Sequence, residues 1–95
     1  MRKWHNKELT YNIVDEDVFY MIKRLNELEI GEQGVIQNIY LDEMSFFRLS
    51  RLGVMKDNII KVKFNSPFND PVAYQVNNSI FTIRKQDAAK IEVRV

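Results

Sequence analysis

The stretch that decides the fold covers residues 65–93 and reads NSPFNDPVAYQVNNSIFTIRKQDAAKIEV. Pro67 and Pro71 lie near its start. Because proline fixes its own φ and lacks an N–H, we expect a tight turn there that leads into a strand. Two runs rich in β-branched and aromatic residues follow, at residues 72–76 and 80–84. Such residues favour strands, so the stretch predicts a turn followed by a β-hairpin.

Asn77 and Asn78 separate the two runs. Asparagine tolerates a positive φ better than most residues, and a two-residue hairpin turn requires one. Residues 86–90 then contain good helix formers and predict a single helical turn. Residues 91–95 alternate apolar and charged side chains, which is typical of a half-buried strand.

Upstream of this stretch, the chain predicts two more strands with a helix between them. The strands are residues 35–40 and 59–64, both rich in β-branched and aromatic side chains. The helix is expected over residues 43–52. Asp42 suits its N-cap, and Gly53 suits the left-handed residue that follows its end.

The predicted helix has one apolar face, which we expect to turn inward. At helical spacing this inner face holds Leu41, Met44, Leu49 and Leu52. Phe47 lies at the edge of the face, and Phe46 points nearly the opposite way.

The first quarter of the chain predicts an extension. Residues 1–7 are polar and basic and predict a tail, and residues 9–14 alternate in a way that predicts a short strand. Acids at 15–17 suit a helix N-terminus, and apolar residues at helical spacing predict a helix over residues 16–27. Two roles stay open for this extension: its apolar face packs on the core, or it binds a partner or a second copy.

Composition excludes several classes of protein. The 95 residues suffice for one domain with a modest core, and the net charge is +1. A nucleic-acid binder needs a larger basic excess, so no nucleic acid is expected as a partner. The absence of Cys removes disulfides and thiolate metal sites. No apolar run approaches the roughly 20 residues of a membrane span, and we expect a soluble, cytoplasmic chain.

Three segments together resemble the FeoA family, small proteins of bacterial ferrous iron transport. They are SPFNDP at 66–71, IRKQDAAKIEV at 83–93 and LEIGEQG at 28–34. Their order and spacing make the resemblance specific, and it covers residues 25–95. It implies a mainly β fold, a small SH3-like barrel of about five strands with one helix after the first strand. Residues 1–24 lie outside it as an N-terminal helical extension.

The chain departs from the family pattern at three turns where the family favours glycine. Asp57, Asn69 and Asn78 stand at these positions. Asp and Asn are among the non-glycine residues that best tolerate left-handed backbone, so the turns can survive. Lys56 replaces the family's proline before the first of these turns.

The resemblance implies a function and a partner. FeoA-like proteins are non-catalytic accessory proteins of ferrous iron uptake, and their usual partner is the membrane permease FeoB, which has a cytoplasmic G-protein domain. The chain would reach the membrane only through that partner. The alternative is a stand-alone regulatory module of metal-dependent gene control, because DtxR-type repressors carry a similar SH3-like domain. The oligomeric state stays open.

Residues that could carry catalysis are scarce, so we expect no enzyme. The single histidine, His5, lies in the predicted tail, and the glycines form no phosphate-binding loop. The family is associated with transition metals, but without Cys a site for Fe²⁺ or Zn²⁺ would need carboxylates. We therefore expect at most a weak association; the candidate acids are Asp42, Glu43, Asp70, Asp87 and Glu92.

Three residues are candidates for partner binding. Arg84 matches the arginine of the family's C-terminal motif and could pair with a partner's carboxylate; the alternative is an internal ion pair with Asp87 or Asp70. Phe46 and Phe68 are candidate exposed aromatics, which often anchor protein contacts. The alternatives are that Phe46 packs under the extension and that Phe68 closes the end of the barrel.

Overall fold

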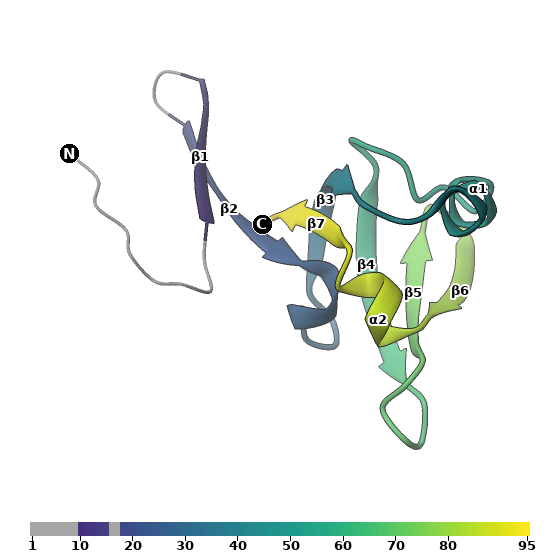
Figure 1. Cartoon of the computed structure of the whole chain (residues 1–95). Helices are drawn as coiled ribbons and strands as arrows, with labels where there is room; N and C mark the ends of the chain where they lie inside the picture. The colour runs from purple at the N-terminus through teal and green to yellow at the C-terminus, as the bar shows by residue number, and fades with distance from the viewer. Residues whose placement is uncertain (1–9, 16–17) are drawn as a thin grey trace.

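One curled antiparallel sheet forms the body of the molecule (Figure 1). The computed structural model describes residues 10–15 and 18–95. Over these residues the strand order is β1-β2-β7-β3-β4-β5-β6. The strands are β1 Thr10–Asp15, β2 Val18–Arg24, β3 Gln33–Ile39, β4 Ile59–Asn65, β5 Val72–Val76, β6 Ser79–Ile83 and β7 Ile91–Arg94. The helices are η1 Leu25–Glu27, a 3₁₀ turn, α1 Glu43–Ser50 and α2 Lys85–Ala88.

The predicted β core is confirmed strand by strand. The expected strands correspond to β3 to β7, α1 follows β3, and α2 supplies the helical turn before β7. The short strand expected at residues 9–14 is β1. One core fills the inside of the sheet, and its fully buried members include Leu25 of η1, Leu49 of α1 and Tyr74 of β5. Burying one such side chain contributes about 1.5–3 kcal/mol.

The helix expected over residues 16–27 is wrong. From Val18 to Arg24 the backbone is strand β2, and only Leu25–Glu27 is helical, as η1. β2 pairs with β7, with Ile22 opposite Arg94 and Arg24 opposite Glu92. The residues of β2 read VFYMIKR, and β-branched and aromatic residues favour a strand where a sheet edge is open for pairing. The predicted tail with His5 and the acids at 16–17 lie outside the described residues.

Turns with asparagine or aspartate adopt the expected left-handed backbone, with one correction. Asp57 has a φ of 77° and Asn69 one of 64°. In the β5–β6 hairpin the positive φ, 53°, belongs to Asn77 and not to the predicted Asn78. A two-residue turn with a positive φ at its first central residue alone has the φ signs of type II′ rather than type I′.

α1 is closed at both ends by the residues that the sequence indicates. The Asp42 carboxylate accepts a hydrogen bond from the Ser45 N–H at 2.8 Å, as an N-cap does. At the other end Gly53 has a φ of 103°. Across it the Val54 N–H donates to the Leu49 carbonyl at 3.1 Å, a bond of the Schellman motif.

Met44 is the one residue of the predicted inner face of α1 that the structure places elsewhere. Leu49 is buried, and Leu41 and Leu52 pack partly buried against the core, as expected. Met44 is 82% exposed. It precedes Leu49 by five residues, which is about 140° around a helix of 3.6 residues per turn. Once Leu49 points inward, Met44 must point outward.

Replacing Gly53 with alanine should cost more stability than replacing Gly31. Both glycines have positive φ, 103° and 91°, so each substitution forces about 1–2 kcal/mol of backbone strain. A Cβ on Gly53 would also lie 2.9 Å from Cγ1 of Val76, whereas a Cβ on Gly31 meets nothing within 4 Å. We expect Gly53→Ala to lose about 1–3 kcal/mol more than Gly31→Ala in urea unfolding. Equal losses would show that Val76 moves aside without cost.

Candidate functional site

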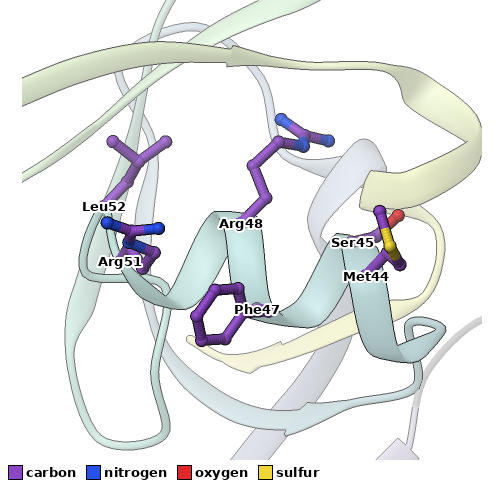
Figure 2. Close-up of a pocket in the computed structure, with 6 residues that line it drawn as sticks. All are labelled: Met44, Ser45, Phe47, Arg48, Arg51 and Leu52. Atoms are coloured by element: carbon purple, nitrogen blue, oxygen red, sulfur yellow. The ribbon is translucent and has the colours of Figure 1, made fainter.

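The outward face of α1 carries an exposed apolar stripe beside a groove. Met44 is 82% exposed and Phe47 61% exposed, and both lie on the side of the helix away from Leu49. Arg51 continues the stripe one turn later. We call the shallow hollow along this face the α1 groove; it has a volume of about 590 Å³ and is lined by Met44, Ser45, Phe47, Arg48, Arg51 and Leu52 (Figure 2). Exposed apolar residues that share one face mark a binding surface better than scattered ones.

The groove is positively charged at one end and the helix is acidic at the other. Arg48 and Arg51 lie in its lining. The Arg51 guanidinium carbon is 5.3 Å from the centre of the Phe47 ring, a cation–π contact that holds the two side chains together. Asp42 and Glu43 begin the helix and are both exposed. Charge of both signs is therefore available to a partner along this face.

The aromatic residues expected at a partner surface are exposed, at opposite ends of the molecule. Phe46 is 45% exposed on the flank of α1. Phe68 is 89% exposed in the β4–β5 loop, so it does not close the end of the barrel. Figure 1 shows this loop far from α1.

Arg84 lies at the same end as Phe68. It is the N-cap residue of α2 and is exposed. The internal ion pair with Asp70 or Asp87 does not form among the described residues. Instead, the Asp70 carboxylate accepts a hydrogen bond from the backbone N–H of Lys85 at 2.9 Å. This bond fastens the loop of Phe68 to the start of α2 and brings Phe68 and Arg84 to one end.

A second hollow lies beside this end of the molecule. It has a volume of about 430 Å³, and its lining includes Asn26, Asn65, Tyr74 and Lys85. Burial, and secondarily the nearby charge of Asp70, raises the pKa of Tyr74 to about 12. The phenol of Tyr74 therefore stays neutral at physiological pH.

The carboxylates considered as metal ligands mostly serve the fold. Asp42 caps α1 and Asp70 caps α2. Glu92 accepts a hydrogen bond from Nδ2 of Asn38 at 3.0 Å. Across residues 10–15 and 18–95, no three His, Cys, Asp or Glu side chains gather as a metal site would need. In the same part of the chain, no helix has the length and hydropathy of a membrane span.

The sequence did not single out the residues of the α1 groove. Helical spacing assigns Met44 to the inner face and Phe47 to its edge, and it gives no binding role to Arg48 or Arg51. A signal was present: Met44, Phe47 and Arg51 follow each other at spacings of three and four, which places them on one stripe. On the side opposite Leu49, a helix that only faces water would carry polar residues, whereas this helix carries Met44 and Phe47 there.

Comparison with known proteins gives consistent matches. The FeoA domain model matches residues 23–95. The Fe(2+) transport protein A/Fe(2+) transporter FeoB fusion protein of Porphyromonas gingivalis is 35% identical over 72 residues, which are 76% of this chain and 8% of that protein. The crystal structure of an iron uptake regulatory protein, FeoA, superposes with a TM-score of 0.70 at 27% identity, over 78% of this chain and 97% of its own.

Two further structures share the fold. FeoA of Stenotrophomonas maltophilia, crystallised with zinc and described as a procaryotic SH3 domain protein, has a TM-score of 0.60 at 24% identity, over 75% of this chain and 87% of its own. A manganese-dependent transcriptional repressor has a TM-score of 0.68 at 16% identity, over 77% of this chain and 41% of its own. The expected SH3-like fold class is confirmed.

Replacing Asp70 with alanine should lower the free energy of unfolding by about 0.5–2 kcal/mol, because the Lys85 N–H loses its acceptor. Asp70→Asn keeps a side-chain oxygen in place and should lose less. Urea unfolding of the three proteins measures both effects. If the alanine variant is as stable as the parent, the bond to Lys85 adds nothing to stability.

Stability should fall between pH 10 and 12 because of Tyr74. Its pKa is raised from 10.0 to about 12 in the folded chain, so in this range the unfolded chain releases a proton that the folded chain keeps. Tyr74→Phe has no such proton and should show a shallower loss of unfolding free energy above pH 10. Tyr40→Phe, at an exposed tyrosine, is the matched control. Equal slopes for Tyr74→Phe and the parent would contradict the expectation.

Proposed function

Because the chain belongs to the FeoA domain family, we propose that it is a non-catalytic accessory protein of ferrous iron uptake that docks on the cytoplasmic part of an FeoB-type permease. It would regulate transport or assembly of that permease from the cytoplasm. The metal-transport chemistry would belong to the partner. The chain would contribute contact surfaces.

The main support for this proposal is the fusion protein of Porphyromonas gingivalis. Its name joins an Fe(2+) transport protein A to the transporter FeoB. Two domains in one chain meet at a high effective concentration, so the fusion favours a functional contact between them. The present chain spans only 8% of the length of that protein, so the partner of the whole protein is carried over to this chain as part of the proposal.

The surfaces that this chain offers support a docking role. The α1 groove with Phe46 on its flank forms one candidate contact, and Phe68 with Arg84 forms another. An exposed aromatic residue can fill a pocket on a partner, and the guanidinium of Arg84 can bind a carboxylate through two hydrogen bonds. We propose Phe46, Phe68 and Arg84 as docking residues on these grounds.

We propose only a weak association of the chain itself with Fe²⁺ or Zn²⁺. The zinc complex of Stenotrophomonas maltophilia FeoA supports such an association for that protein. Here Asp42 and Asp70 hold backbone N–H groups, and a metal would have to compete with these bonds. Binding of a metal would therefore cost part of the helix capping.

The alternative is a module of metal-dependent gene control. A manganese-dependent transcriptional repressor shares the fold at 16% identity, and a likeness at this identity concerns the fold alone. A chain acting in this way would change transcription without touching a permease. The two functions therefore differ in the partner that must be found.

Direct titration tests the docking proposal. Purified full-length chain is titrated with the cytoplasmic part of the FeoB-type permease from the same organism, with a GTP analogue and with GDP, in a calorimeter. Ferrous iron uptake is measured in cells with and without the gene. We expect binding and reduced uptake on deletion. No binding together with unchanged uptake would overturn the proposal, and a changed metal-responsive reporter would then favour the repressor module.

Alanine variants locate the contact. If the permease binds at α1, Phe46→Ala should weaken binding by at least about tenfold. If it binds at the other end, Phe68→Ala and Arg84→Ala should each do so. Ile80→Ala, at an exposed apolar residue of β6, is the control and should bind like the parent. Parent-like affinity for all three docking variants would show that the permease uses another surface.

A further inference from the structure

The outward stripe of α1 has charges of opposite sign four residues before and four residues after one aromatic residue. Glu43 lies four residues before Phe47, and Arg51 lies four residues after it. Residues four apart on a helix lie on one face. Both charged side chains are exposed, as is the ring between them. If a second α1 lies antiparallel to the first, the acid of each helix therefore faces the base of the other, and the two aromatic residues face each other.

The two charges cannot satisfy each other within one copy. Eight residues of helix separate their positions by about 12 Å. Over residues 10–15 and 18–95, the carboxylate of Glu43 makes no hydrogen bond or ion pair. Arg51 contacts the Phe47 ring at 5.3 Å, which leaves its N–H groups free for a carboxylate.

We propose that α1 packs antiparallel against α1 of a second copy of this chain, with Phe47 at the two-fold axis. In a two-fold contact, residue i of one copy meets residue j of the other, and the reverse holds as well. With Phe47 at the centre, position 43 of each copy lies across from position 51 of the other. Two Glu43–Arg51 ion pairs form, one on each side of the aromatic centre.

The apolar part of the stripe supplies the centre of this contact. Met44 and Phe47 are the most exposed apolar residues of α1. Two Phe47 rings on the axis can adopt an offset or edge-to-face arrangement. The unbranched Met44 side chain can fill the space that remains beside them. The antiparallel helices also place their dipoles in the favourable opposed direction.

A second copy satisfies this face better than the other occupants do. An acidic peptide would pair with Arg51, but its acidic groups would repel the carboxylate of Glu43. An anionic membrane would attract Arg48 and Arg51 but repel Asp42 and Glu43. A second copy presents a base to the acid and an acid to the base at the same time.

The contact is small, so the association is weak. α1 has eight residues, about 12 Å of helix, and we expect a dissociation constant of roughly 0.1–1 mM. Where the proposed function holds, copies held on neighbouring permeases would meet at a high local concentration, which favours such a weak contact.

Concentration-dependent NMR spectra of the full-length chain test the contact. Between about 0.05 mM and about 2 mM, we expect backbone amide shifts that cluster on α1 and that fit a monomer–dimer equilibrium. Light scattering at the higher concentration should give a rising average mass. Spectra that stay constant over this range would overturn the proposal.

Charge reversal supplies the decisive experiment. Glu43→Arg places two bases on each copy and Arg51→Glu places two acids, so each variant alone should associate at least about tenfold more weakly than the parent. An equal mixture of the two should recover parent-like association, because residues 43 and 51 of one variant then face opposite charges at residues 51 and 43 of the other. Glu29→Arg, which makes the same charge change at an exposed site outside α1, is the matched control and should leave association unchanged.

The outcomes separate this contact from the docking function. If the mixture does not recover association, the second-copy arrangement is wrong even where the permease domain binds. If the α1 amide signals shift on addition of the permease domain but not with the concentration of the chain alone, the permease binds this face and the dimer is overturned. If concentration shifts α1 and the permease domain binds nowhere, the dimer stands and the docking function fails.

Discussion

The sheet depends on the position of its last strand. β7 lies between β2 and β3, so the end of the chain joins the N-terminal strands to the rest of the sheet. Ile91 and Val93 are fully buried beneath that junction. Because these pairs join residues far apart in sequence, the fold is established only when the chain has come together from both ends. Gly34 reflects the crowding there, since a Cβ at this position would lie 2.9 Å from Cγ2 of Val93.

The same junction explains what sequence alone could and could not predict. Residues 72–76 and 79–83 carry their own turn, and α1 carries its own cap in Asp42 and its own stop in Gly53. Such elements rest on local chemistry, so their patterns predict them. The residues of β2 fit helical spacing as well as a strand, and the choice falls to pairing with β7, about 70 residues away in sequence.

Prediction of the candidate site failed in a different way. Phe46 and Phe68 are exposed, which is one of the two placements that the sequence leaves open for each. The outward stripe of α1 is not predicted, because Met44 fits an apolar face equally well on either side until Leu49 fixes the rotation of the helix. Of the two roles open to Arg84, the internal ion pair does not form among the described residues, and Asp70 accepts a hydrogen bond from the backbone N–H of Lys85 instead. A carboxylate can accept a hydrogen bond from a guanidinium or from a backbone N–H, so the sequence alone does not identify its partner.

The bond between Asp70 and the Lys85 N–H also bears on how such chains are recognised. The turn that ends in Asp-Pro and the Arg-Lys motif 13 residues later look like independent marks of ancestry. In the folded chain the carboxylate of one starts the helix of the other. The donor is a backbone N–H, which any residue except proline supplies, so this bond constrains the acid at position 70 and not the side chains of the Arg-Lys motif. A distant relative that caps this helix in another way could therefore lose the Asp-Pro mark, retain the Arg-Lys motif and still keep the fold.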